Sequence, residues 1–339
     1  MRWSRTVTVV GCHTGGEIGD VVVGGLGHVP GDTMFEKKLY MEENLDDVRK
    51  LLLFQPRGSV TRSVNFVLPP TDPAAQMGYV IAETTEYPVM SGSNTICTAT
   101  VLLETGMVPM ASPETRLVLE SPAGLIPLTC EVVDGKVVSV ELVNQPAFVY
   151  HLDAEIEVPG YGKVRVDVAW GGMAYVIADA ADLGFSLDPT EAPELCRVGQ
   201  LLKTVAAEQL SAVHPLERRY AGITQTEFAG PLRREDGMLV ARNAVIVSPG
   251  RVDRSPCGTG TSARLAVLHS KGLIEPGESF VHESLIGSRY VGRIEELTTV
   301  GDVPAVVPSI AGQAHISSIA QVGLDPSDPF PTGFLLADA

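Results

Sequence analysis

Short apolar runs alternate with turn residues along the first half of the chain. Val, Ile and Phe favour the half-buried, pleated backbone of a sheet, so these runs predict β-strands. They lie at residues 5–13, 19–25, 63–69, 77–83 and, as a longer series, 115–144. Inside the last stretch an Asp-Gly pair at 134–135 is flanked by alternating valines, which predicts a β-hairpin turn.

Four stretches instead have the pattern of a helix. Residues 42–54 are amphipathic and end before the sequence QPRG, where Pro and Gly stop a helix. Residues 91–106 begin with Ser, Gly, Ser and Asn, which are good helix caps, and close on Gly106. In the second half, residues 193–210 and 257–272 are predicted to be helical, the latter again with a small polar start and a closing glycine.

The second half repeats the plan of the first. Strand patterns at 162–180 and 240–255 each precede one of the two later helices, so that strand, long helix, strand and polar-capped helix occur once on each side of about residue 150. We therefore expect two similarly built α/β domains. The expected division is residues 1–148 with the closing segment 313–339, and residues 149–312.

Composition narrows the class of partner. The 339 residues are 45% apolar and 19% charged, which is typical of an ordered globular protein. A formal charge of −16 argues against binding nucleic acid or an anionic membrane, and a small-molecule partner fits better. The sequence has no apolar run long enough to span a membrane and no signal-peptide pattern at its start, so a cytoplasmic location is expected.

The cysteines and histidines do not indicate a metal site or a disulfide framework. Five cysteines, an odd number, contain no CxxC pair, and the seven histidines have no HxxxH or HExxH spacing. Four of the cysteines lie in apolar runs and are expected in the core: Cys12, Cys97, Cys130 and Cys196.

The two polar helix starts carry the candidate chemistry. Ser91 and Cys257 each stand directly before a glycine at the beginning of a predicted helix. Unpaired N–H groups and the positive end of the helix dipole attract a carboxylate there and favour the anionic form of a nucleophile. A thiol at such a position can have a lowered pKa, which would make Cys257 a base. Thr259 adds a hydroxyl, and Asp253 could accept a hydrogen bond from a substrate amine.

Each start taken alone could be a capped turn with a buried cysteine or a simple Ser/Asn cap. Two such starts, one in each half of a repeated plan, suit a reaction that needs one group on each face of a flat intermediate. That reaction is inversion at an α-carbon, in which one residue removes a proton and the other returns one from the opposite side. It requires neither a metal nor pyridoxal phosphate.

The motifs extend this hypothesis to a known family. The chain resembles the proline racemase family, which includes hydroxyproline 2-epimerases and trans-3-hydroxy-L-proline dehydratases, and it is more distantly similar to diaminopimelate epimerase. The resemblance lies in HTGGE (13–17), PGDTMFEK (30–37), PRG (56–58), MSGSN (90–94), WGG (170–172), DRSPCGTGTSARLAVLHSKG (253–272) and IGSRYVGRI (286–294). It implies two pseudo-symmetric α+β domains, each a curved sheet or barrel around a helix, with the active site in the cleft between them.

The resemblance also implies roles for individual residues. Cys257 matches one of two acid/base cysteines, and Ser91 stands where the racemases have the other. The resemblance assigns the substrate carboxylate to Gly258 and Thr259, and the ring nitrogen to Asp253. Further substrate contacts are expected from the start of the first polar-capped helix: Gly92, Ser93 and Asn94. The chain departs from the racemase pattern at Ser91 and at Ser93, which replaces a histidine.

A serine hydroxyl is a much weaker acid than a thiol, so the departure bears on the reaction. The expected activity is a cofactor-independent hydroxyproline 2-epimerase that acts through Ser91 and Cys257. A trans-3-hydroxy-L-proline dehydratase, which needs one base, and a non-catalytic binder of cyclic amino acids are the alternatives. The expected partner is proline or hydroxyproline, and the expected state is a monomer or homodimer. His13 is expected to have a structural role, and Arg57 and Arg62 either steer a carboxylate or form ion pairs.

Overall fold

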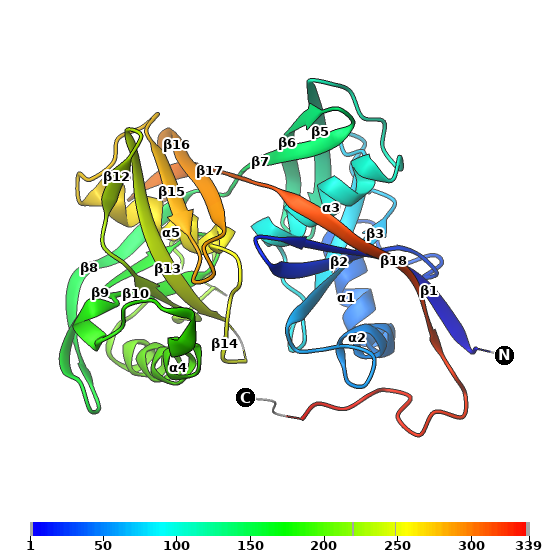
Figure 1. The fold of residues 1–339 in the computed structure, drawn as a ribbon, viewed down its shortest axis with the longest axis horizontal. Helices are drawn as coiled ribbons and strands as arrows, with labels where there is room; N and C mark the ends of the chain where they lie inside the picture. Colours follow the sequence, from blue (N-terminus) through cyan, green and yellow to red (C-terminus); the bar gives the residue numbers. More distant parts are fainter. Residues whose placement is uncertain (1–2, 219, 248, 337–339) are drawn as a thin grey trace. The chain divides into compact units, whose positions relative to one another are not determined.

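The computed structural model describes residues 3–218, 220–247 and 249–336. The chain divides into two compact units (Figure 1). Unit 1 consists of Met1–Leu142 and Gly312–Ala339, and unit 2 of Val143–Ala311. Each unit is a mixed α+β structure dominated by a sheet, which confirms the predicted fold class.

The described residues of unit 1 form eight strands and three helices. The strands hydrogen-bond in the order β18, β1, β2, β3, β4, β5, β6 and β7. Their bounds are β1 Arg5–Thr14, β2 Glu17–Gly24, β3 Arg62–Leu68, β4 Met77–Ala82, β5 Glu114–Ser121, β6 Gly124–Val133, β7 Lys136–Val143 and β18 Ala314–Leu324. The helices are α1 Met34–Asn44, α2 Asp46–Leu53 and α3 Gly92–Glu104.

The helix predicted over 42–54 is in fact the end of one helix followed by a second. α1 begins at a capping box in which the Thr33 side chain accepts the Glu36 N–H and the Glu36 carboxylate accepts the Thr33 N–H. Leu45 leaves the helical conformation, with φ −128° and ψ 17°, and α2 starts after it with two acidic residues in its first turn. The pattern T-x-x-E at 33–36 is the signal that could have located α1.

Unit 2 forms a closed ring of eight strands. The ring runs β8, β9, β10, β11, β13, β15, β16, β17 and back to β8. The bounds are β8 Ala147–Val158, β9 Gly162–Trp170, β10 Ala174–Asp179, β11 Gln225–Ala229, β13 Met238–Val247, β15 Ser279–Glu283, β16 Arg289–Val300 and β17 Val303–Gly312, with the short strands β12 Arg233–Glu235 and β14 Arg251–Val252 beside β13. The helices are α4 Ala192–Gln209 and α5 Gly258–Ser270, and two short 3₁₀ turns cover Ala181–Leu183 and Pro189–Glu191.

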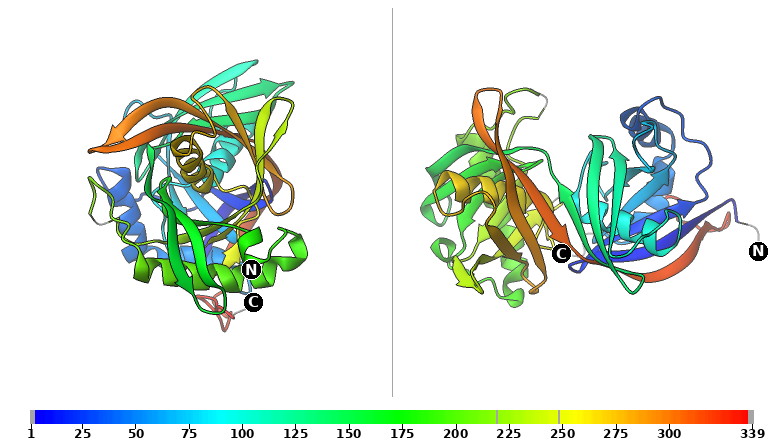
Figure 2. Two further views of the ribbon diagram at one scale, coloured as in Figure 1. Left: turned by 90° about the vertical axis from the view of Figure 1, so that its left-hand side faces the viewer. Right: turned by 90° about the horizontal axis from the view of Figure 1, so that it is seen from above.

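The strands of unit 2 curve around α5, drawn yellow to gold in Figure 2 (left), while α4 lies outside the barrel. The strand register explains which residues of the barrel face α5 on the inside and which face α4 on the outside. Val245 of β13 pairs with Glu227 of β11, and both belong to the inner face that α5 covers. The neighbouring residues Phe228 and Ile246 point outward and pack with α4. The amphipathic pattern over 193–210 correctly predicted this outer helix.

The two inner helices α3 and α5 are buried on nearly all sides, and small residues allow the sheet to approach them. Ten of the thirteen residues of α5 are buried, mostly Gly, Ala, Ser, Thr and Leu. At Gly171 an added Cβ would lie 2.1 Å from the Thr259 carbonyl oxygen, and at Gly19 it would lie 2.9 Å from Asn94 Oδ1 of α3. Glycine is therefore required where a turn or strand touches the first turn of each inner helix.

The predicted hairpin at 134–135 is also confirmed. Asp134 and Gly135 have φ values of 50° and 74°, as a two-residue turn between β6 and β7 requires. In the part of the chain that the structure describes, every helix is too short or too polar to cross a membrane.

Candidate active site

Ser91 begins α3, as the sequence predicted. Its backbone is extended, with φ −156° and ψ 124°, and its carbonyl oxygen accepts the first intrahelical bond from the Thr95 N–H at 2.9 Å. The Thr95 hydroxyl donates to the same carbonyl at 2.7 Å. Tyr79 of β4 in turn lies 2.6 Å from Thr95 Oγ1. The backbone of Ser91 is therefore fixed through two layers of buried hydrogen bonds.

The Ser91 hydroxyl is held by one amide and lies beside a second hydroxyl. Asn94 Nδ2 donates to Ser91 Oγ at 3.0 Å, and Ser93 Oγ lies 3.3 Å away. Asn65 of β3, which is fully buried, donates to Asn94 Oδ1 at 2.9 Å and so orients that amide. Among the described residues, Ser91 Oγ forms no hydrogen bond with a carboxylate or an imidazole. The hydroxyl therefore has donors that support it and no strong base beside it.

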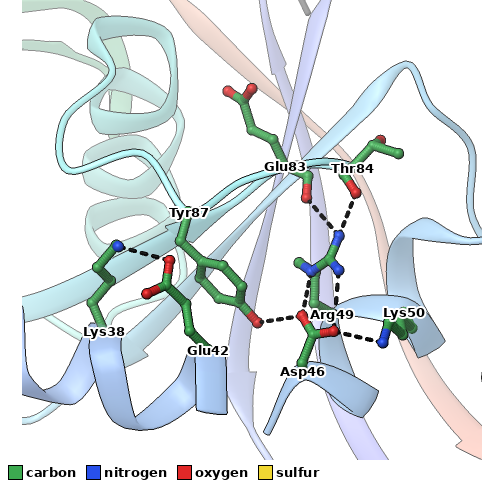
Figure 3. A network of polar contacts seen from close by, with 8 residues as sticks. All are labelled: Lys38, Glu42, Asp46, Arg49, Lys50, Glu83, Thr84 and Tyr87. Carbon is green, nitrogen blue, oxygen red and sulfur yellow. Dashed lines mark hydrogen bonds and ion pairs between the residues drawn. The ribbon is translucent and has the colours of Figure 1, made fainter. Parts of the chain in front are cut away.

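The loop that precedes Ser91 is tied to α2 by Arg49 (Figure 3). The Arg49 guanidinium donates to the carbonyl oxygens of Glu83 and Thr84 and forms an ion pair with Asp46 at 2.6 Å. Burial would raise the pKa of Asp46, but Arg49 and Lys50 outweigh it and lower the pKa to about 2. The pair is thus ionised over the whole neutral range and anchors the loop.

Cys257 begins α5 in a strained conformation. Its φ of 69° and ψ of 112° lie in a region that residues with a side chain rarely adopt. The carbonyl oxygen of Cys257 accepts both the Thr261 N–H at 2.8 Å and the Thr261 hydroxyl at 2.7 Å. The strained turn directs Cys257 Sγ back over the helix start, where it accepts the Gly260 N–H at 3.4 Å.

The sulfur lies among hydroxyl groups in a nearly dry environment. Tyr175 Oη is 3.3 Å from Cys257 Sγ and 2.6 Å from Thr259 Oγ1, and Thr259 Oγ1 is 3.7 Å from the sulfur. Burial raises the pKa of the thiol, and the Asp253 carboxylate raises it further. The helix end was predicted to lower this pKa, and that prediction was wrong because desolvation and a like charge outweigh the contacts from Tyr175 and Gly260.

The loop before Cys257 is rigid. Asp253 Oδ1 accepts the N–H and the hydroxyl of Ser255 at 2.8 and 2.9 Å, and Ser255 Oγ accepts the Cys257 N–H at 3.1 Å. Asn243 of β13 donates to the carbonyl oxygen of Pro256 at 2.9 Å. Asp253, which is 8% exposed, is therefore held close to the sulfur as a largely buried negative charge.

The predicted site residues fall into two groups. Unit 2 brings together the group around the thiol: Asp253, Cys257, Gly258 and Thr259. Unit 1 carries the group around the hydroxyl: Ser91, Gly92, Ser93 and Asn94. Sequence reasoning missed the strand residues that contact these starts, Tyr79, Asn65 and Tyr175, because each is a single polar residue inside a strand.

The remaining candidates have structural partners. Arg57 forms an ion pair with Asp328 at 2.5 Å, and Arg62 forms one with Asp20 at 2.9 Å. The ring of His13 lies 5.5 Å from that of His315. Of the four cysteines expected in the core, Cys12, Cys97 and Cys130 are buried and Cys196 is half-buried.

Comparison with known proteins identifies the family of the chain. The sequence pattern of the family described as proline racemase matches residues 9–335. A crystal structure of a hydroxyproline epimerase from Agrobacterium vitis, with bound trans-4-hydroxy-L-proline, is 39% identical, covers 100% of this chain and 97% of its own, and superposes with a TM-score of 0.90. A probable proline racemase from Agrobacterium radiobacter K84, with bound carbonate, is 36% identical over 98% of this chain and 97% of its own, with a TM-score of 0.88.

A phenazine biosynthesis protein of the PhzF family from Bacillus anthracis shares the fold alone, at 13% identity and a TM-score of 0.61, with 94% of this chain and 99% of its own covered. The two more similar structures support an isomerase of the racemase and epimerase type. The chain belongs to the proline racemase family.

Proposed function

We propose that the protein is a cofactor-independent hydroxyproline 2-epimerase that inverts the Cα of trans-4-hydroxy-L-proline, of a 3-hydroxyproline, or of both. The observation that carries the proposal is the start of α5, where Cys257 Sγ, the free N–H groups of the first turn and the Asp253 carboxylate lie together. An imino acid requires a base at its Cα, an anion site for its carboxylate and a negative charge for its ring nitrogen. The thiol, the helix start and Asp253 can supply these three groups in turn.

In this proposal the substrate itself activates the thiol. The first-turn N–H groups of Gly258 and Thr259 receive the substrate carboxylate, and Asp253 receives the ring ammonium. Burial raises the pKa of Cys257 in the free protein, and Asp253 raises it further. A bound ammonium neutralises the charge of Asp253, so the pKa of the thiol falls when substrate binds. Cys257 then gives up its proton more readily at the point where a Cα proton has to be removed.

Ser91 supplies the second proton-handling group. The Cα–H bond breaks toward the sulfur of Cys257, and its electron pair is stabilised as a carbanion conjugated with the carboxylate. The Ser91 hydroxyl then donates its proton to the opposite face of Cα, and solvent restores the proton to Ser91. Asn94 Nδ2, which donates to Ser91 Oγ at 3.0 Å, stabilises the oxygen as it loses its proton. We therefore assign Asn94 to the support of Ser91.

One observation favours dehydration of trans-3-hydroxy-L-proline as a second candidate. The described contacts of Ser91 Oγ are an amide N–H and another hydroxyl, so Ser91 is equipped to donate a proton and poorly equipped to take one. Elimination needs only one base at Cα, a role that Cys257 can fill, and a donor for the departing C3 hydroxyl. The product would be an enamine that rearranges to the cyclic imine.

The two candidates are tested with two substrates in D₂O. Trans-4-hydroxy-L-proline should give cis-4-hydroxy-D-proline carrying deuterium at Cα, resolved by chiral chromatography and mass spectrometry. An imine-reactive product from trans-3-hydroxy-L-proline would favour the dehydratase. Cα exchange without either product would refute both reactions, and no exchange at all would identify a binding protein. Cys257→Ala should abolish all exchange, whereas Cys196→Ala, a half-buried cysteine of the same unit, should retain it.

A further inference from the structure

Beneath the start of α5 lies a buried acid and imidazole that the proposed reaction does not use. Glu227 of β11 and His282 of β15 both have fully buried side chains. His282 Nε2 is 3.5 Å from Glu227 Oε1. Within the described residues, neither oxygen of Glu227 nor Nε2 of His282 has another hydrogen-bond partner. Two unsatisfied buried groups that face each other require an explanation, because an unpaired buried polar group is costly.

The strand register explains why the two side chains meet. β13 lies between β11 and β15, with Val245 opposite Glu227 and Ala241 opposite His282. Ala241 and Val245 lie on the same face of β13 as Asn243, which is the face toward α5. Glu227 and His282 therefore point into the barrel from either side of one strand.

The hydrogen-bond directions place a hydrogen on His282 Nδ1. The Thr261 hydroxyl has one hydrogen, and the Cys257 carbonyl oxygen at 2.7 Å can only accept it. Thr261 Oγ1 must then accept from His282 Nδ1, which is 2.9 Å away. A neutral imidazole with its hydrogen on Nδ1 presents a lone pair at Nε2. An ionised Glu227 would face that lone pair with another, whereas a protonated Glu227 can donate to it.

The charges around the pair agree with a neutral acid. Burial raises the pKa of Glu227 to about 8, and Arg264 of α5 offsets this only in part. Burial lowers the pKa of His282 well below its usual value, and Arg264 lowers it further. Cys257, which flanks Gly260 together with Glu227, and Tyr175 of β10, which contacts Cys257, are both neutral because burial raises their pKa values, and Asp253 is the charged group that acts on both.

The pair formed by Glu227 and His282 lies close to the sulfur of Cys257. A Cβ added at Gly260 would lie 3.2 Å from Glu227 Oε2 and 3.3 Å from Cys257 Sγ, so the carboxyl group and the thiol flank a single glycine. A charge on Glu227 would therefore be felt at the sulfur. In unit 1 the Ser91 carbonyl oxygen likewise accepts a hydrogen bond from a threonine hydroxyl, that of Thr95. Thr95, however, contacts the phenol of Tyr79 and not a histidine.

From these observations we infer that Glu227 and His282 are positioning residues for Cys257. A neutral relay from the Glu227 carboxylic acid through His282 and Thr261 to the Cys257 carbonyl holds the strained backbone of Cys257 and adds no second charge to that of Asp253 beside the sulfur. The inference rests on the proposed function, in which Cys257 handles the Cα proton. It makes Glu227 a group that must stay protonated for the thiol to be correctly held.

Kinetics of Glu227 variants test the relay. Glu227→Leu removes the donor and should lower kcat for Cα inversion at least 10-fold at pH 7 with KM within about 3-fold. Glu227→Gln supplies an amide N–H in its place and should restore kcat to within about 3-fold. The wild-type kcat should fall above pH 8, and Glu227→Gln should lack that fall. Glu283 follows His282 in β15 and forms ion pairs with Arg233 and Arg289. Glu283→Gln is therefore the matched control and should keep the wild-type pH profile.

Equal kcat values for the Leu and Gln variants would overturn the relay, as would an alkaline fall that persists in Glu227→Gln. A direct measurement covers the case in which Glu227→Leu does not fold. In protein with ¹⁵N-labelled histidine, His282, assigned by comparison with His282→Gln, should show a protonated Nδ1 and an unprotonated, hydrogen-bonded Nε2. Protonation of both nitrogens at pH 7 would refute the neutral pair.

A turnover-independent readout separates the relay from the proposed function. The rate of iodoacetamide alkylation at Cys257, followed by peptide mass spectrometry, should depend differently on pH in wild-type protein and in Glu227→Gln. If that difference is present and no proline derivative is converted, the proposed function fails and the relay stands. If substrate is converted and the alkylation profiles coincide, the relay fails and the function stands.

Discussion

The pair formed by Glu227 and His282 makes the stability of unit 2 depend on pH in a way that can be worked out. In the folded protein the pair holds one proton, on Glu227, up to a pKa of about 8. In the unfolded chain the glutamate releases its proton near 4.5 and the histidine near 6.5. Between these two values the folded and unfolded chains hold one proton each, so the pair contributes no slope there.

Above pH 6.5 the unfolded pair holds no proton while the folded pair retains one, so stability falls as pH rises. Each pH unit in that window changes the free energy of unfolding by about 1.4 kcal/mol. Over the interval from 6.5 to about 8 the loss is therefore about 2 kcal/mol. The sign follows from the folded-state pKa of Glu227, which is raised above its unfolded value.

Glu227→Gln should change the pH window in which stability is lost. The folded variant holds no proton at this pair, because burial keeps His282 neutral. Its stability should be flat above pH 6.5 and fall below it by about 1.4 kcal/mol per pH unit as the unfolded histidine binds a proton. The difference between variant and wild type thus changes in one direction across the whole range from 4.5 to about 8.

Urea unfolding followed by tryptophan fluorescence measures this difference. The chain has two tryptophans, Trp3 in unit 1 and Trp170 in unit 2, so a Trp3→Phe background reports unit 2 alone. The free energies of unfolding are measured at pH 5, 6.5 and 8 for wild type and for Glu227→Gln. In the difference between the two proteins, the contributions of all other titrating groups cancel to first order. Wild-type and variant curves that run parallel in pH would refute the assigned proton, whatever their absolute stabilities.

Three further predictions follow from the site. Ser91→Cys should raise kcat for inversion in both directions at least several-fold, measured by polarimetry starting from either epimer, and an unchanged kcat would count against Ser91 as the second proton donor. Asp253→Asn should lower the pKa of Cys257 and speed its alkylation at pH 8 while raising KM, and slower alkylation would contradict the charge effect. Gly171→Ala should cost about 1–3 kcal/mol or more by urea unfolding, because its Cβ would meet the backbone of α5, whereas Gly24→Ala, with its nearest contact at 3.7 Å, should cost less than half as much.

The parts of the fold that local sequence determines were predictable. Both inner helices were located because Ser91 and Cys257 precede glycine and small polar residues, and both closing glycines, Gly106 and Gly272, have positive φ values. The hairpin at 134–135 was equally local. The break at Leu45 was not found, because nothing in the apolar pattern distinguishes a leucine that ends one helix from one inside it.

The partners of the site could not be read from the sequence. Glu227 and His282 are single polar residues in the apolar strands QTEFA and SFVHE, and they are 55 positions apart in the chain. They meet only because both strands pair with β13. The direction of the Cys257 pKa shift was mispredicted for the same reason, since burial and the placement of Asp253 are properties of the packed barrel.

A threonine stands four residues after Ser91 and four residues after Cys257, and in each unit its hydroxyl donates to the carbonyl oxygen of the residue at the helix start. In unit 1 the crossover β4–α3–β5 joins parallel strands, and Tyr79 comes from the strand before the helix. In unit 2 the crossover β13–α5–β15 also joins parallel strands, but His282 comes from the strand after the helix. The two units therefore anchor a buried threonine hydroxyl from opposite ends of the crossover, with a phenol in one and an imidazole in the other.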